Sequence, residues 1–288
     1  MRTRILTGIV AFLLFLPFLI FSDTVAFPLI MAFCAVWSVG ELLRCVKLWR
    51  RVSLSLPLCL VAVACPLCLR LAGIEVTLKA SVAVILVLML YILAVTTFSK
   101  GKILVNEAAT ALLTSLYVIA GFSAMVYLHD FHEGGKYLYL LTFIGAWVPD
   151  TFAYFTGMLF GKHKLIPDVS PKKTVEGAIG GALFCVLAFV GFALVYNHLW
   201  IAEGGQALPI WLMAAIGLIT AVVSMVGDLT MSLIKRHYGI KDFGKIMPGH
   251  GGVLDRFDSI LAASTILLIC CAVAETVAHV QLFSLITA

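Results

Sequence analysis

The chain has 288 residues, of which 62% are hydrophobic and only 12% are charged, and its mean hydropathy is +1.09. Water-soluble domains are about 45–50% apolar and about 25% charged, so a soluble globular enzyme, a disordered chain and a collagen-like chain are excluded. The net charge of +5 is small and its basic residues stand in short clusters between apolar runs, which excludes a nucleic-acid partner. The composition predicts a protein of the lipid bilayer.

About nine apolar runs are each long enough to cross a bilayer as a helix, which takes about 20 residues. We place them at 5–22, 24–43, 53–72, 77–98, 107–128, 138–160, 175–197, 209–234 and 259–285. The first run lacks a small-residue cleavage site and leads directly into the second, so we interpret it as a helix rather than a signal peptide. The expected fold class is therefore an all-α polytopic membrane protein.

Basic residues are distributed unevenly between the two sides that these runs define. With the N-terminus in the cytoplasm, 17 of the 20 Lys and Arg residues fall on the inner side, as the positive-inside rule requires. An odd number of helices then places the C-terminus outside. Two inner loops, 161–174 and 235–258, are long and polar, so we expect an active site at cytoplasmic helix ends. Residues 101–288 would form the catalytic region, and residues 1–100 would anchor the protein and shape a lipid entrance.

Small residues spaced four apart line the run 138–160, and glycines open the run 175–197. They are Ala153, Gly157, Gly161, Gly177, Gly180 and Gly181. Small residues let the backbones of two membrane helices approach closely. We therefore expect these two runs to pack tightly against each other.

Asp150 and Tyr154 stand one helical turn apart on the run 138–160. A carboxylate inside a membrane span requires a partner or a function. Two interpretations of Asp150 stay open: it is a metal or substrate ligand, or it is a buried hydrogen-bond partner of Tyr154.

The inner loop 161–174 ends in Ser170-Pro-Lys-Lys-Thr174. Ser followed by Pro is typical of a helix start, with Ser170 as N-cap and Pro171 at the first helical position. Lys172 and Lys173 would then lie in a first turn, where cations are unfavourable unless an anion binds there. We expect phosphate binding by Ser170 and the two lysines; the alternative is a lysine pair that serves membrane orientation alone.

Three further carboxylates lie in or beside the last two runs. Asp228 lies about two turns before the cytoplasmic end of one run, and Asp255 and Asp258 stand three apart on one helical face at the start of the next. Carboxylates that converge repel each other unless a cation separates them, and oxygen-only ligands favour Mg²⁺. The alternative is ion pairing with basic residues nearby in sequence, namely Lys235, Arg236 and Arg256. The glycine-rich turn at 248–252 favours the metal site.

The residues around these carboxylates resemble the signature of CDP-diacylglycerol synthases, also called phosphatidate cytidylyltransferases. The matching segments are Ser232-Leu-Ile-Lys-Arg236, Ile240-Lys-Asp242, Pro248-Gly-His-Gly-Gly-Val-Leu-Asp-Arg-Phe-Asp-Ser259, Ser170-Pro-Lys-Lys-Thr-Val-Glu-Gly177 and Asp150-x-x-x-Tyr154. They cover roughly residues 147–260 and fix glycines, charges and a proline in order, so the resemblance is specific.

The resemblance implies a reaction in which CTP and phosphatidic acid give CDP-diacylglycerol and pyrophosphate. It further implies Mg²⁺ with K⁺ as a second ion, a homodimer, and a place in a bacterial-type cytoplasmic membrane. Carried over by position, Asp228, Asp255 and Asp258 match the metal ligands, which agrees with the cost of burying them. Arg236 and Lys241 are expected to assist catalysis by steadying phosphates.

The remaining expected site residues contact substrate through side chains or closely approaching backbone. They are Asp150, Tyr154, Ser170, Lys172, Lys173, Lys235, Gly249, His250, Gly251, Gly252 and Arg256. For His250 two interpretations stay open, a hydrogen bond to a phosphate and packing of the turn.

Two other functions compete with cytidylyl transfer. A CTP-dependent lipid kinase of the dolichol or phytol type would move a γ-phosphate to an alcohol, and the complete signature argues against it. An ion-coupled transporter also carries intramembrane carboxylates, but near mid-membrane and within inverted repeats. Neither feature is evident in the sequence.

Overall fold

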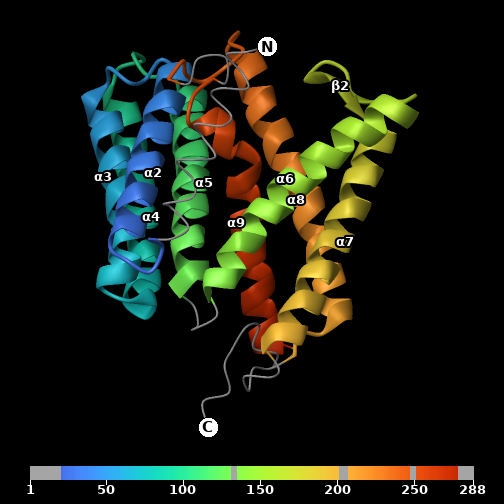
Figure 1. The fold of residues 1–288 in the computed structure, drawn as a ribbon. Coiled ribbons are helices and arrows are strands. Elements are labelled where there is room, and N and C mark those ends of the chain that lie inside the picture. Colours follow the sequence, from blue (N-terminus) through green and yellow to red (C-terminus); the bar gives the residue numbers. More distant parts are fainter. Residues whose placement is uncertain (1–20, 131–134, 201–206, 247–250, 278–288) are drawn as a thin grey trace. The chain divides into compact units, whose positions relative to one another are not determined.

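The computed structural model describes residues 21–130, 135–200, 207–246 and 251–277, and this part of the chain is almost wholly helical (Figure 1). The helices are α2 (Ala26–Cys45), α3 (Val52–Leu71), α4 (Ile74–Phe98), α5 (Val105–Asp130), α6 (Gly135–Phe160), α7 (Val175–Trp200), α8 (Ile210–His237) and α9 (Leu254–Val277). Between α6 and α7 the strands β1 (Lys164–Ile166) and β2 (Ser170–Thr174) form an antiparallel hairpin.

Every one of the eight helices in the described ranges is long and apolar enough to cross a membrane. Their bounds agree closely with eight of the predicted runs, so the expectation of a multi-pass, all-α membrane protein is confirmed for this part of the chain. The largest shift is in α9, which begins at Leu254 rather than at residue 259. The predicted run 5–22 lies outside the described residues.

The chain divides into two compact units. The first consists of Met1–Tyr127 and His237–Phe257, and the second of Leu128–Arg236 and Asp258–Ala288. Helix α9 therefore starts within the first unit and continues in the second. The assignment of anchoring to residues 1–100 and of catalysis to residues 101–288 stays a prediction.

In the first unit α2 packs against α3, and α3 packs against α4. The three helices are similarly apolar but differ in burial: 61% of the residues in the apolar window of α2 are buried, against 11% in α4. An apolar helix whose side chains are exposed on most sides is suited to contact lipid. Helix α2 is thus an interior element of this unit, and α4 is a lipid-facing one.

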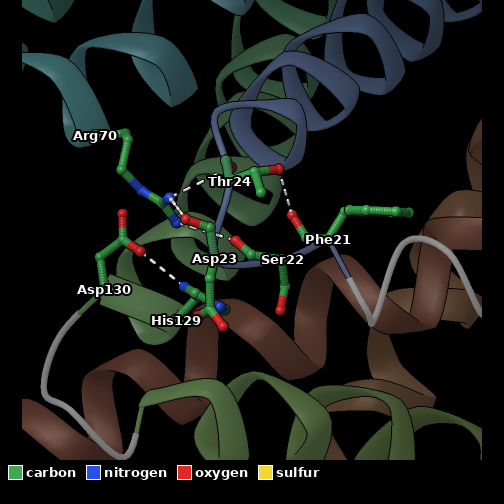
Figure 2. A network of polar contacts seen from close by, with 7 residues as sticks. All are labelled: Phe21, Ser22, Asp23, Thr24, Arg70, His129 and Asp130. Carbon is green, nitrogen blue, oxygen red and sulfur yellow. Dashed lines mark hydrogen bonds and ion pairs between the residues drawn. The ribbon is translucent and has the colours of Figure 1, made fainter.

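Arg70, in the last turn of α3, holds the segment that leads into α2 (Figure 2). Its guanidinium donates to the backbone carbonyls of Ser22, Asp23 and Thr24 over 3.2–3.3 Å. Arg70 is one of three basic residues that the predicted topology leaves outside. These three hydrogen bonds give a local structural reason for a basic residue on the side that is predicted to be outside.

In the second unit the backbones of α6 and α7 come into contact, as the small residues predict. A Cβ atom added at Gly177 would lie 2.6 Å from the carbonyl oxygen of Ala153. One added at Gly181 would lie 2.6 Å from the carbonyl oxygen of Pro149. Since a real Cβ does not approach an oxygen so closely, larger residues at either position would force the helices apart. The predicted tight packing of these two helices is confirmed.

Candidate functional site

The segment that carries Ser170 is a strand, not the start of a helix. Strand β2 pairs antiparallel with β1, and Ile166 lies opposite Ser170. Helix α7 begins only at Val175, so the predicted N-cap role of Ser170 and the helical position of Pro171 are wrong. Both strands of a two-stranded ribbon are edge strands, where a proline without an N–H is tolerated. Residues 170–174 therefore pair with β1 as a strand, although the Ser-Pro pair is typical of a helix start.

Thr174 and Glu176 shape the actual start of α7. The Thr174 hydroxyl accepts a hydrogen bond from the N–H of Gly177 at 3.1 Å, as an N-cap residue does. The Glu176 carboxylate accepts from the backbone N–H groups of Lys162 at 3.1 Å and His163 at 3.2 Å. It also lies 2.6 Å from Nδ1 of the His163 ring. Glu176 thereby fastens the chain entering the hairpin to the first turn of α7.

Lys172 and Lys173 lie on β2 in different surroundings. Lys172 is exposed, whereas the Lys173 side chain is 25% exposed and its ammonium lies 2.5 Å from Oδ2 of Asp228 in α8. Since neither lysine lies in a helical turn, the dipole argument for phosphate binding does not apply to them. The hairpin instead supplies a cation to a carboxylate in a membrane-spanning helix, where a partner is needed.

Asp150 and Asp258 lie near Asp228 in the second unit. The three carboxylates are close enough for their charges to interact. The Ser259 hydroxyl is hydrogen-bonded to Asp150, and the charge of the buried Lys235 acts on Asp258. The second unit thus gathers three of the acidic residues expected at the site together with two of the expected lysines.

Tyr154 is not part of this group. Its side chain is 66% exposed, and its ring contacts Phe155. The hydrogen bond of Asp150 goes to Ser259, so the interpretation of Asp150 as a buried partner of Tyr154 is not supported. Its role as a metal or substrate ligand stays a prediction.

The acidic residues of the second unit suit a hard cation chemically, because Asp150, Asp228 and Asp258 offer only carboxylate oxygens. Across the described ranges, however, no three Asp, Glu, His or Cys side chains are grouped closely enough to hold a metal ion. Mg²⁺ is often bound by one or two carboxylates and completes its shell with water and substrate phosphate. The residues therefore fit a cation that binds together with a phosphate, and metal binding stays a prediction.

In the first unit, Asp255 holds the glycine-rich loop, by which we mean residues 238–253 between α8 and α9. Its Oδ2 accepts from the backbone N–H groups of Phe243 at 2.7 Å and Gly252 at 2.9 Å. Gly251 has a φ of +86°, which favours glycine, and a Cβ there would lie 2.8 Å from the same oxygen. One carboxylate oxygen thus ties two stretches of the loop to the first turn of α9.

Glu41 of α2 lies against the same loop and is only 2% exposed. Its Oε1 accepts from the N–H of Val253 at 3.2 Å, and its Oε2 accepts from the N–H of Leu254 at 2.9 Å. Nε1 of Trp37 donates to Oε1 at 3.2 Å. A Cβ added at Gly252 would overlap the Glu41 carboxylate. The group that approaches the backbone closely at Gly252 is therefore the Glu41 carboxylate of the protein itself.

The other expected site residues are found in varied positions. Arg236, Lys241 and Arg256 are exposed. Gly249 and His250 lie outside the described residues. The substrate or catalytic roles given to all five stay predictions.

Sequence reasoning missed Glu41, Thr174 and Glu176. A signal for Glu41 was present, because a lone carboxylate in an apolar run is costly in the same way as Asp228. Thr174 is a good N-cap residue, but the Ser-Pro pair four positions earlier gave a competing signal. For Glu176 no sequence pattern indicates that its partners are backbone amides of the preceding loop.

The chain matches the model of the cytidylyltransferase family over residues 2–274. The phosphatidate cytidylyltransferase of Staphylococcus haemolyticus (strain JCSC1435) is 36% identical to it over 266 residues, which cover 91% of this chain and 95% of that protein. Relatives with the same name in Staphylococcus saprophyticus and Staphylococcus aureus (strain COL) are 36% and 35% identical, with the same coverage. The similarity thus extends well beyond the signature into the N-terminal helices. The chain belongs to the cytidylyltransferase family.

Proposed function

We propose that the protein is a phosphatidate cytidylyltransferase, which transfers the cytidylyl group of CTP to phosphatidic acid. The products are CDP-diacylglycerol, a precursor in phospholipid biosynthesis, and pyrophosphate. The observation that carries the proposal is the similarity to relatives of that name over 91% of the chain. The grouping of lysines with carboxylates in the second unit supports it, because both substrates are phosphates.

The reaction depends on charge neutralisation and in-line positioning. A phosphate oxygen of phosphatidic acid forms a bond to the α-phosphorus of CTP, and the bond to the pyrophosphate oxygen breaks, with its electron pair leaving on pyrophosphate. Because the nucleophile is already an anion, no strong general base is needed. Lys173 and Lys235 would hold phosphate oxygens at the carboxylate group, and the exposed cations Lys172, Arg236 and Lys241 would steady phosphates of either substrate.

The proposal includes Mg²⁺ held by Asp228, Asp255 and Asp258, with K⁺ as a second ion. When bound, Mg²⁺ supplies charge neutralisation on the reacting phosphates. The oxygen-only donors and the resemblance of the signature support this assignment. Asp228 would be one of the residues that hold the cation, and the Lys173 ammonium beside it would bind a phosphate oxygen.

The proposal also places the protein in its membrane. We place the N-terminus in the cytoplasm and the C-terminus outside, with about nine spans in a bacterial cytoplasmic membrane and the active site at the inner face. The distribution of 17 of the 20 basic residues supports this orientation. The homodimer is proposed from the resemblance of the signature.

The test is turnover of labelled CTP with phosphatidic acid and Mg²⁺ in detergent, comparing the wild type with Asp228→Asn. We expect CDP-diacylglycerol from the wild type and a rate about 100-fold lower in the variant, since a charge-stabilising group is lost. Asp168→Asn, an exposed aspartate in the hairpin turn, is the matched control and should keep its rate. Phosphorylation of an added lipid alcohol, with phosphatidic acid inert, would favour the kinase, and no turnover by folded protein would refute both.

A further inference from the structure

Glu41 is the only acidic residue of α2, a helix that contributes nothing to the expected active site. The carboxylate is buried, and a buried charge is strongly disfavoured unless hydrogen bonds replace the lost water. Three donors do so, namely the N–H groups of Val253 and Leu254 and the indole of Trp37. Two of these donors belong to the signature segment.

Glu41 holds the start of α9. The first N–H groups of a helix have no partner within it, and a carboxylate beside them also interacts favourably with the helix dipole. Helix α9 begins at Leu254, and the N–H groups of Val253 and Leu254 are bound by the two oxygens of Glu41. Glu41 therefore caps α9 from a helix more than 200 residues earlier in the chain.

The glycine-rich loop is shaped to admit this carboxylate. A Cβ added at either Gly244 or Gly252 would overlap Glu41. The N–H of Gly252 is bound by Asp255, so the amides of three successive residues, 252 to 254, all donate to protein carboxylates. These three amides therefore already have acceptors within the protein and are not free to bind a phosphate.

We infer that Glu41 is a positioning residue for cytidylyl transfer. By fixing the first turn of α9 it sets the direction of Asp255, which is expected to be a metal ligand, and of the helix face that Asp255 shares with Asp258 one turn later. Glu41 itself touches no reacting atom. The inference rests on the proposed function for its kinetic consequence, whereas the capping of α9 does not depend on that function.

The test compares Glu41→Gln with the wild type by hydrogen exchange and by steady-state kinetics. Gln keeps the size of Glu but offers one acceptor oxygen, so at least one amide at 253–254 loses its partner. We expect these amides to exchange about 100-fold faster in substrate-free protein, because their opening becomes local. We expect kcat per folded molecule to fall about 100-fold, since a small displacement of catalytic groups has that effect. KM for either substrate should change by less than about threefold.

Glu75→Gln is the matched control, because Glu75 lies in α4 with its side chain 82% exposed and pairs only with Lys79 among the contacts the structure gives it. It should leave exchange and kcat as in the wild type. If Glu41→Gln does not fold, Glu41→Asp carries the same test, since the shorter side chain keeps the charge but cannot reach both amides.

Each outcome decides the inference. Wild-type exchange and kcat in the Glu41 variant would overturn it, and so would a loss of kcat with unchanged exchange at 253–254. Faster exchange with an unchanged kcat would reduce Glu41 to a structural cap. Failure of the wild type to convert CTP and phosphatidic acid would refute the proposed function, while the exchange measurement would still decide whether Glu41 caps α9.

Discussion

The hairpin and the glycine-rich loop are each fastened by a glutamate that accepts two successive backbone N–H groups. Glu176, which holds the hairpin, has a side chain 26% exposed and lies 13–14 residues from its partners. Glu41, which holds the glycine-rich loop, is 2% exposed and lies 212–213 residues from its partners. Water can replace the hydrogen bonds of Glu176 but not those of Glu41, so breaking the latter costs more.

The difference in burial between Glu41 and Glu176 indicates that the glycine-rich loop and the hairpin have different roles. The glycine-rich loop ends in residues held by two buried carboxylates, which suits the fixed presentation of Asp255. The hairpin carries an exposed Lys172 and a Lys173 whose contact, Asp228, is itself partly exposed. Lysines on an adjustable element can follow a phosphate through a reaction, whereas metal ligands need a constant geometry.

Gly252→Ala is the change expected to disturb the glycine-rich loop most. The new Cβ would overlap the Glu41 carboxylate, which cannot move without breaking its hydrogen bonds. Overpacking of a buried site costs about 1–3 kcal/mol, and we expect about 3 kcal/mol here. Thermal unfolding in detergent, followed by tryptophan fluorescence, measures the loss.

The control for this change is Gly191→Ala in α7, where an added Cβ meets nothing within 4 Å. Alanine is the better helix former, so this variant should be as stable as the wild type or slightly more so. If both variants unfolded at the same temperature, the glycine-rich loop would be as adjustable as the hairpin. The proposed difference between the two loops would then be wrong.

Lys173→Met should affect catalysis more than stability. Its ammonium is the hairpin charge next to Asp228, so we expect kcat/KM for CTP to fall about 100-fold, equivalent to about 2.7 kcal/mol. Lys172→Met, on the exposed face of the same strand, should lose about tenfold or less. Equal losses in the two variants would show that the hairpin acts through its total charge and not through one placed lysine.

Glu176→Gln should have the smallest effect of the three. The partly exposed carboxylate is replaced by an amide of the same size, and water can serve the N–H groups that lose an acceptor, so we expect about 1 kcal/mol of lost stability. Hydrogen exchange at Lys162 and His163 should quicken while turnover stays near that of the wild type. A loss of turnover as large as that of Lys173→Met would mean that the hairpin also needs a fixed geometry.

The sequence predicted the helices well because the bilayer sets their length and composition without reference to tertiary partners. It failed at Ser170, where a local helix signal competed with strand pairing to β1. It also placed the start of the last span five residues late, because Asp255, Arg256 and Asp258 interrupt the apolar run that was used to locate it.

At the candidate site, the cost of burying charge in a membrane span is enough to single out Asp228 and Asp258, and the structure places Asp150 beside them. The pairing of Lys173 with Asp228 could not be predicted in this way, because it depends on the direction in which the hairpin leaves α6. Predicting Glu41 required the same cost argument to be applied to α2, where the sequence analysis did not apply it.

The capping of α9 by Glu41 has a consequence for biogenesis. The ribosome must add 212 residues after Glu41 before Val253 exists, which takes roughly 10–40 s at roughly 5–20 residues per second. Once α2 has entered the membrane, its carboxylate lacks these two backbone donors for the rest of that interval, at a cost of up to about 3 kcal/mol on insertion scales. Synthesis of α9 therefore stabilises α2 in the membrane. Nascent chains that stop before α9 would expose this defect to membrane proteases.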